Sequence, residues 1–286
     1  MTQNNDPWPR IAVIGGGQMA RSLVGGWVAR GAPATNITVA DPLPEQRAWL
    51  AERFPGLAVQ ADNAAAAQDA EVWLLAVKPQ QLAGVASSLA PLAATIQPLV
   101  ISIVAGIQAA DIDRWLGGNA SIVRAMPNRP ALIGAGASAL YAASNVDQAA
   151  RARAGRLIEA VGSTVWVDSE GDMDSVTAVS GSGPAYFFLL IELLEAAGVA
   201  EGLSPAVARR LAIDTAAGAA EMARTSPDDP ATLRAQVTSK GGTTAAALAV
   251  FEAAGLRDIV GRAVAAAAAR SRELAAEFGR DPVTAG

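Results

Sequence analysis

The feature that most constrains the fold is a glycine turn that directly follows an apolar run near the start of the chain. Residues 11–14 predict a buried strand, and a helical pattern begins after Gly17. Gly15, Gly17 and Ala20 have the spacing G-x-G-x-x-A, which is typical of a strand–turn–helix unit that binds a dinucleotide. Gly15 permits the tight turn, Gly17 lets the backbone approach a pyrophosphate, and Ala20 lets the helix pack close to the strand. An ordinary strand-to-helix turn that needs glycine is the alternative.

Short apolar runs alternate with helical patterns through the first half of the chain. A strand–helix–strand series of this kind predicts a parallel sheet with helices on both faces. After about residue 169 only helical periodicity remains. We therefore predict an α/β fold, with a Rossmann-type parallel sheet in residues 1–168 and an all-α domain in residues 169–286. Strands are expected at residues 11–14, 37–40, 57–59, 71–77, 99–104, 121–124, 137–142 and 164–167, and helices at 19–30, 45–53, 80–89, 107–116 and 146–161.

The composition excludes several kinds of chemistry and several partners. The chain has no cysteine and no histidine, so it has no disulfide, no zinc–sulfur site and no histidine general base. The formal net charge of -5 and the scattered arginines give no reason to expect nucleic acid. Residues 1–9 lack a signal-peptide layout, and the longest apolar run, residues 185–194, is shorter than the roughly 20 residues of a membrane span. We therefore expect a cytoplasmic protein without a membrane partner.

Two helical segments in the second half, residues 185–197 and 263–269, are apolar nearly all round. Such a helix is buried on several sides in a folded protein. A partner subunit that covers one face is the better explanation for them, so we predict a homo-oligomer. A helical bundle that buries these segments by itself is the alternative.

Residues at the strand ends indicate where a ligand binds, because an open parallel sheet binds ligands beyond the carboxyl ends of its strands. Besides the glycine turn, these ends carry Asp41, the sequence Val77-Lys78-Pro79, the pair at 105–106, and Asn128. Lys78 is interpreted either as a contact to a cofactor or as a solvated lysine. Asn128 offers both a donor and an acceptor to a nicotinamide carboxamide, or serves a turn after proline.

Asp41 bears on the choice of cofactor. A carboxylate at the end of the second strand accepts hydrogen bonds from both ribose hydroxyls and repels a 2′-phosphate, which favours NADH. Arg47 is close enough in sequence to reach a phosphate, so NADPH remains open. The other interpretation of Asp41 is a turn residue before Pro42.

Two further segments combine glycine with hydroxyl side chains before a helix. Residues 180–186 read SGSGPAY, and residues 238–244 read TSKGGTT. A glycine turn that leads into a helix points several N–H groups at one spot, which suits an anion. The first segment is interpreted as an anion or cofactor site, or as a plain helix start. The second has more hydroxyls than a plain turn needs, and it predicts a cradle for a carboxylate.

Five motifs of the chain together resemble one enzyme family. They are GGGQMA at residues 15–20, AVKPQ at 76–80, RAMPN at 124–128, AVSGSGPAY at 178–186 and VTSKGGTT at 237–244. On these motifs the chain is similar to the pyrroline-5-carboxylate reductases over nearly its whole length. The resemblance implies a Rossmann domain, a helical dimerisation domain and an active site at the dimer interface, with dimers that assemble into a decamer in many members.

The resemblance also implies roles for individual residues. Ser239 and the backbone amides of Gly242 and Thr243 would hold the substrate carboxylate, and Thr244 would bond the ring nitrogen, which makes Ser239 and Thr244 the expected catalytic residues. Ser182 and Gly183 would lie on the nicotinamide side. The other expected cofactor residues are Gly15, Gly17, Gln18, Met19, Ala20, Asp41, Asn63, Val77, Lys78, Pro79 and Asn128.

The chain departs from the family pattern at two positions. Arg129 stands where the family usually has threonine, and Lys240 stands where it usually has proline. Arg129 places a large charge beside the expected nicotinamide edge, and Lys240 relaxes a rigid turn while it adds attraction for a carboxylate. Family members often prefer NADPH, which Asp41 does not predict.

The reaction implied by the resemblance is hydride transfer from NADPH or NADH to the C=N carbon of L-1-pyrroline-5-carboxylate, which gives L-proline. Such a reaction needs no strong protein acid when the C=N is already protonated, which is consistent with a chain that lacks histidine. One alternative is another two-domain dehydrogenase that acts on a hydroxy or keto acid and uses Lys240 as its acid/base. A second alternative is a regulator that senses NAD(P) without turnover.

Overall fold

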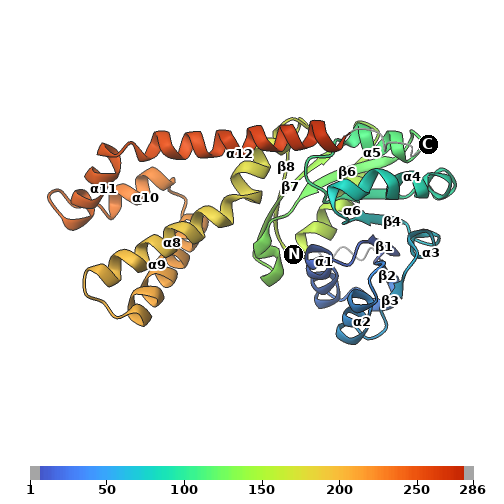
Figure 1. Ribbon diagram of the computed structural model, residues 1–286, viewed down its shortest axis with the longest axis horizontal. Coiled ribbons are helices and arrows are strands. Elements are labelled where there is room, and N and C mark those ends of the chain that lie inside the picture. Colours follow the sequence, from blue (N-terminus) through green and yellow to red (C-terminus); the bar gives the residue numbers. More distant parts are fainter. Residues whose placement is uncertain (1–6, 280–286) are drawn as a thin grey trace. The chain divides into compact units, whose positions relative to one another are not determined.

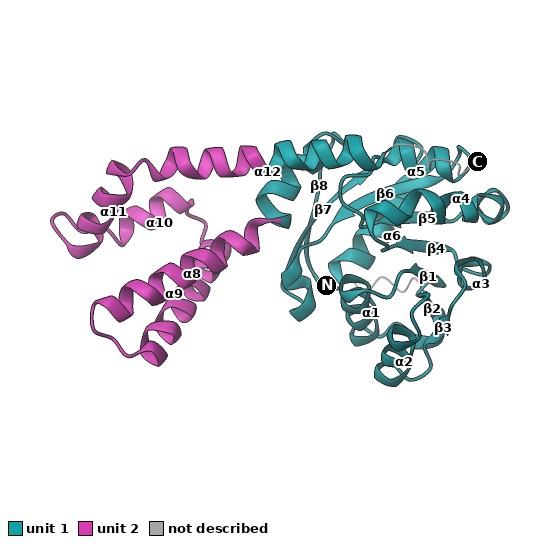
Figure 2. Ribbon diagram, viewed as in Figure 1, with its two compact units in different colours: residues 1–181, 267–286 teal, residues 182–266 magenta. Residues whose placement is uncertain are grey.

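The computed structural model describes residues 7–279, and the chain forms two compact units (Figure 1, Figure 2). One unit comprises residues 1–181 and 267–286, and the other comprises residues 182–266. The last helix of the chain therefore begins in the second unit and ends in the first. The division into domains at 1–168 and 169–286 stays a prediction.

The first unit is built on a single eight-stranded sheet with the order β3-β2-β1-β4-β5-β6-β7-β8. Because β1 has β2 on one side and β4 on the other, the strand order reverses at β1, which is where open α/β sheets bind their ligands. The strands are β1 (Ile11–Ile14), β2 (Ile37–Ala40), β3 (Ala58–Gln60), β4 (Val72–Leu75), β5 (Leu99–Ser102), β6 (Ser121–Met126), β7 (Gly136–Ala142) and β8 (Gly162–Trp166).

The sheet is parallel as predicted, except for one strand pair. Strand β7 runs antiparallel to β6, with Val123 opposite Ala142, while every other pair is parallel. Only one short 3-10 helix, Arg129–Ile133, separates these two strands. A link of that length cannot make the long crossover that a parallel pair requires, but it suffices for an antiparallel pair.

Helices cover the two faces of the sheet, and each face has its own apolar core. In β1 the side chains of Ile11 and Val13 join one core, while those of Ala12 and Ile14 join the other. This alternation is the period of a strand buried on both faces. The first core is closed by α1 (Gln18–Ala29), α2 (Pro44–Arg53) and α6 (Gln148–Glu159), and the second by α3 (Asn63–Ala67), α4 (Pro79–Ile96) and α5 (Ala109–Trp115).

Helix α4 is longer than the sequence predicts. The prediction ends this helix at residue 89, yet the helix continues through Pro91 to Ile96. Leu89 and Ala93 are both buried, and their i, i+4 spacing places them on the same face of the helix. Burial of that face carries the helix past a proline that removes one backbone hydrogen bond.

The glycine–serine segment at 180–186 does not start a new helix. Residues Thr177–Gly181 form a π-helical turn that joins α7 (Asp172–Val176) to α8 (Gly183–Ala200). The result is one helix of 29 residues, Asp172–Ala200, which contains an 18-residue window with a mean hydropathy of 1.4. The interpretation of this segment as a free helix start is therefore wrong. The sequence estimate of the longest apolar helix is also too short, because by length and composition this helix is able to cross a membrane.

The second unit consists of helices only. Residues Ala208 and Ala212 of α9 are buried, and Ala208 packs against the backbone of Gly198 in α8. Asp229 caps α10 by accepting from the backbone N–H of Thr232 at 2.8 Å, and this hydrogen bond lowers the pKa of the Asp229 carboxyl. The helices are α8, α9 (Pro205–Thr225), α10 (Pro230–Gln236), α11 (Thr243–Ala253) and most of α12 (Leu256–Phe278).

Candidate active site

The turn between β1 and α1 has the geometry that its glycines predict. Gly15 has a φ of +102°, and a Cβ atom there would lie 2.7 Å from the carbonyl oxygen of Ala76, so only glycine fits. A Cβ atom on Gly17 would meet no described atom within 4 Å. Gly17 is the N-cap of α1, and among the described residues no side chain caps this helix. The first N–H groups of α1 therefore face open space and are available to an anion.

Two charged side chains hold the middle of this turn in place. The carboxylate of Asp41, which is only 8% exposed, accepts from the backbone N–H of Gly16 at 2.8 Å and from that of Leu43 at 2.9 Å. Arg21 donates from Nε to the carbonyl oxygen of Gly16 at 3.1 Å. The Gly16 peptide is thus bonded on both sides. Asp41 orders the loop, and its contact to a ribose stays a prediction.

Arg47 lies at the same end of β2. Its guanidinium donates from Nη1 to the carbonyl oxygens of Asp41 and Pro42, at 2.7 and 2.9 Å. These bonds hold the cation beside the end of the strand. A 2′-phosphate at the end of β2 would find this cation near the Asp41 carboxylate, so the structure leaves the choice between NADH and NADPH open.

A cavity of about 720 Å³ brings four of the expected cofactor residues together. Gly15, Asn63, Val77 and Pro79 line it, from the ends of β1 and β4 and the starts of α3 and α4. Lys78 is the N-cap of α4, and its side chain is exposed. The size of the cavity is ordinary for a site that binds a cofactor or small molecule. The lining also includes Phe278 at the end of α12, which no local pattern in the sequence identifies.

Asn128 has structural partners for both ends of its amide. Its Oδ1 accepts from the N–H of Ala137 at 2.9 Å, and its Nδ2 donates to the carbonyl oxygen of Ser180 at 3.1 Å. The π-helical turn is thereby fastened to the end of β6, and Gly181 packs so close to Met126 that a Cβ atom would lie 2.8 Å from its Cε. Ser182 and Gly183 follow directly in the chain. The amide of Asn128 is therefore largely committed to the fold, and its contact to a nicotinamide stays a prediction.

The turn before α11, in the second unit, brings several hydroxyl side chains to the start of a helix. Gly241 has a φ of +73°, and the N–H of Gly242 donates to the carbonyl oxygen of Ser239 at 3.0 Å. A Cβ atom on Gly242 would collide with Ser239 Oγ. Helix α11 begins at Thr243, and no side chain in the described part of the chain caps it. Ser239 and Thr243 are exposed, and Thr244 is half-buried.

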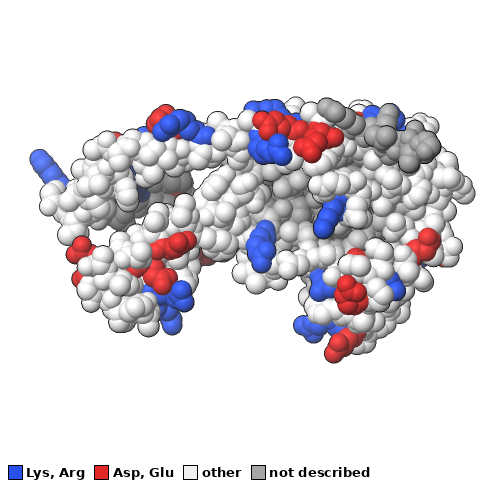
Figure 3. Space-filling model, in the orientation of Figure 1, with Lys and Arg blue, Asp and Glu red and all other residues white. Residues whose placement is uncertain are grey.

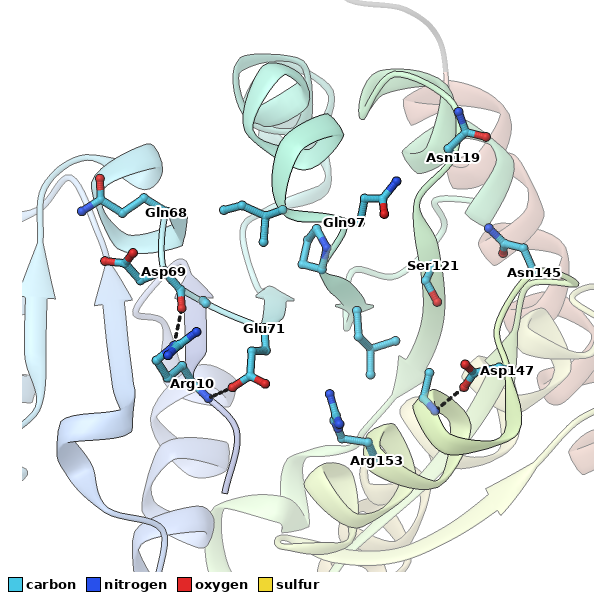
Figure 4. Close-up of a pocket in the computed structure, with 15 residues that line it drawn as sticks. Arg10, Gln68, Asp69, Glu71, Gln97, Asn119, Ser121, Asn145, Asp147 and Arg153 are labelled. Carbon is cyan, nitrogen blue, oxygen red and sulfur yellow. Dashed lines mark hydrogen bonds between the residues drawn. The ribbon is translucent and has the colours of Figure 1, made fainter. Parts of the chain in front are cut away.

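Other parts of the surface do not carry the expected site. A cavity of about 730 Å³ at the opposite edge of the sheet is lined by charged side chains that include Arg10, Glu71, Asp147 and Arg153, and none of the expected site residues lines it (Figure 4). No group of three or more acidic side chains within residues 7–279 is placed to hold a metal ion. On the face drawn in Figure 3, Lys and Arg lie scattered among Asp and Glu and form no basic patch.

Comparison with known proteins gives a consistent result over both units. A family model described as pyrroline-5-carboxylate reductase dimerisation matches residues 170–274, and one described as NADP oxidoreductase, coenzyme F420-dependent, matches residues 10–106. The chain is 50% identical over 272 residues to pyrroline-5-carboxylate reductase of Pseudomonas aeruginosa, with 95% of this chain and 99% of that relative covered.

Solved structures agree with these matches. A pyrroline-5-carboxylate reductase of Coxiella burnetii superposes with a TM-score of 0.89 at 39% identity, covering 93% of this chain and 98% of that one. The Plasmodium falciparum pyrroline carboxylate reductase, solved with NADP bound, gives a TM-score of 0.82 at 29% identity with the same coverage. Because half of its residues match a relative over nearly the whole length of both chains, this chain belongs to the pyrroline-5-carboxylate reductase family.

Proposed function

We propose that the two glycine turns of this chain position NAD(P)H and L-1-pyrroline-5-carboxylate for the reduction that gives L-proline. Membership of the family makes the chain an NAD(P)H-dependent oxidoreductase of proline biosynthesis. When bound, the reduced nicotinamide supplies the hydride that the C=N carbon accepts. The observation that carries the proposal is the pair of uncapped helix starts, at α1 and at α11, each preceded by a glycine turn.

The residues around α1 suit a dinucleotide. The free N–H groups at the start of α1, from Gln18 and Met19 onward, would bind the pyrophosphate, and the open space beside Gly17 admits it. Asn63, Val77, Lys78 and Pro79 would hold the ribose and phosphate groups. We assign Asn128, Ser182 and Gly183 to the nicotinamide side. This division of roles gives most of the cofactor site to residues 1–168, and gives the substrate site, together with Ser182 and Gly183 on the nicotinamide side, to residues 169–286.

The residues before α11 suit a small cyclic acid. Ser239 and the N–H of Thr243 would bind its carboxylate, and Thr244 would hydrogen-bond the ring nitrogen. The N–H of Gly242, which the family resemblance also assigns to the carboxylate, is bonded instead to the carbonyl oxygen of Ser239 and shapes the turn. This arrangement presents one face of the ring to the reduced nicotinamide. A C=N that is already protonated needs no strong acid from the protein, so we assign the chain's contribution to orientation, which is consistent with the absence of histidine. Holding two reactants in the right geometry can contribute roughly 7–11 kcal/mol to the barrier reduction.

We further propose that the site is completed across a dimer interface. The apolar side chains of α8 are exposed in the single chain, among them Phe187, Phe188 and Leu193. A second copy that covers them explains both this exposure and the membrane-length apolar helix better than a bilayer does, because the dimerisation family model spans this helix. Assembly of dimers into a decamer and a cytoplasmic location without nucleic-acid or membrane partners extend the same proposal, and light scattering of the purified protein tests the subunit number.

The test of the function is the loss of NADPH or NADH absorbance on addition of L-1-pyrroline-5-carboxylate, with both cofactors compared at equal concentration. We expect absorbance to fall and proline to accumulate in equal amount. Cofactor binding without proline formation would contradict the proposal.

A further inference from the structure

We propose that Phe278, at the end of the last helix, forms part of the cofactor site and binds the adenosine half of NAD(P)H. The proposal rests on the cofactor role assigned above to the cavity at the start of α3 and α4. Phe278 lines that cavity together with Gly15, Asn63 and Pro79, although more than 180 residues separate it in sequence from the end of α4.

The end of α12 contacts other residues of the first unit, which contains the sheet and is called the sheet unit below, at several points. Ser271 donates from Oγ to the carboxylate of Asp174 at 2.6 Å, and Arg114 donates from Nη2 to the carbonyl oxygen of Gly279 at 3.1 Å. The backbone of Gly106 lies against the helix, since a Cβ atom there would be 3.4 Å from the N of Ala275. Contacts before and after Phe278 therefore fix its position relative to the cavity.

The ring of Phe278 is only partly buried. It packs against the apolar core that contains Ile14 and Leu82, and it also borders the cavity. A phenyl ring that is held on one side by the core and open to a cavity on the other side offers apolar surface to a ligand.

The position of the cavity points to adenosine as the part that it receives. Its other lining residues include Ala40 and Pro42 at the end of β2, and Ala61 just after β3. The end of β2 is where a dinucleotide-binding sheet places the adenosine ribose. An aromatic side chain at this place can contact the face of the purine, and such contacts typically weaken binding several-fold to about a hundredfold when removed.

The test compares Phe278→Ala with Phe278→Tyr, using the full-length enzyme and two reductants. Reduced nicotinamide mononucleotide is the informative probe, because it lacks the adenosine half. We expect Phe278→Ala to raise the KM for NADPH and NADH roughly tenfold with little change in kcat. We expect it to leave kcat/KM for the mononucleotide unchanged, while Phe278→Tyr stays close to wild type. Glu273→Ala, an exposed substitution on the same helix, is the control.

The outcomes of this test distinguish failure of the inference about Phe278 from failure of the proposed function. An unchanged KM for NADPH in Phe278→Ala would overturn the proposal, and so would an equal loss with the mononucleotide, because a merely structural role affects both reductants. If the wild-type enzyme reduces L-1-pyrroline-5-carboxylate while Phe278→Ala behaves like Glu273→Ala, the proposed function stands and this inference fails. If the wild type itself does not turn over with either reductant, the proposed function fails first.

Discussion

The two units of this protein differ in the burial of their large apolar side chains. The sheet unit buries large side chains on both faces of its strands, including Trp27 and Trp73, each of which donates its indole N–H to a backbone carbonyl. In the helical unit the apolar side chains of α8 stay exposed, and Phe187 is 64% exposed. Small residues, Ala208 and Ala212, make up its buried apolar side chains among the described residues.

The two glycine turns also differ in how far their own unit holds them in place. The turn at Gly15–Gly17 is fixed by its own unit, because Gly15 lies against β4 and Gly16 is bonded to Asp41 and Arg21. The turn at Gly241 and Gly242 is bonded to Ser239 beside it, through the N–H of Gly242, and is largely exposed. The first turn is therefore held in place within a single chain, whereas the exposure of the second agrees with our proposal that a second copy encloses it.

The largest effect is expected from Phe187→Asp, which places a charge on the exposed apolar surface of α8 in the helical unit. Burying a phenylalanine contributes about 1.5–3 kcal/mol, and a two-fold interface counts it twice, so we expect the dimer to weaken at least about a hundredfold. Activity should fall with it. Sedimentation velocity measures the assembly. Val165→Asp, at an equally exposed position of 61% in β8, is the control and should stay dimeric and active.

Gly17→Val alters the glycine turn of the sheet unit and should leave the unit folded. The added side chain would occupy the open space beside the start of α1 and block a pyrophosphate, so we expect cofactor affinity to fall by roughly a hundredfold or more at an unchanged melting temperature. Fluorescence titration with NADPH measures the affinity. Gly15→Ala should instead lower the melting temperature, because its Cβ meets the Ala76 carbonyl at 2.7 Å. An unchanged titration curve for Gly17→Val would remove the phosphate role from this turn.

Thr244→Ala removes the hydroxyl assigned to the ring nitrogen. The loss of a hydrogen bond to a charged group costs about 1.5–3 kcal/mol, so kcat should fall about ten- to a hundredfold. Thr243→Ala is the matched control, since it keeps the backbone N–H that we assign to the carboxylate, and its steady-state constants should change little. Wild-type constants for Thr244→Ala would exclude that role.

The smallest effect is expected from Asp41→Ala. Its removal leaves the N–H of Gly16 without its buried partner and takes away the acceptor assigned to the ribose, so NADH should bind several-fold more weakly, with a smaller loss for NADPH. Measured dissociation constants of the variant for NADH and NADPH test whether the loss is larger for NADH. Equal losses would leave Asp41 with the loop-ordering role alone.

The fold was predictable where its determinants are local. The glycine turn after β1 needs only a strand, three small residues and a helix pattern, and the structure places Gly15 at the expected positive φ. The Gly241–Gly242 turn is local in the same sense. Because these two turns carry most of the proposed chemistry, the sequence identifies most of the candidate site.

The features that the sequence patterns did not predict depend on contacts between segments that are distant in the chain. The antiparallel β7 follows from the length of one link. The π-helical turn at Thr177–Gly181 is held by the bond from Asn128 to the carbonyl oxygen of Ser180 and by the bond from the Ser180 hydroxyl to the carbonyl oxygen of Ala137 in β7. Phe278 reaches the cofactor cavity only because Ser271 and Gly106 fasten the end of α12 to the sheet unit. No periodicity or spacing in the sequence reports such long-range packing.

The most direct test of the shared site is subunit complementation between Gly17→Val and Thr244→Ala. If the cofactor turn of one subunit works with the α11 turn of its partner, each mixed dimer contains one site with both turns intact. Equal amounts of the two impaired variants, dissociated and reassembled, should then regain roughly a quarter of wild-type activity, because about half of the dimers are mixed and each has one intact site. A mixture that shows no more activity than the separate variants, with mixed dimers demonstrated by mass spectrometry, would place both turns of each site in a single chain and contradict the account.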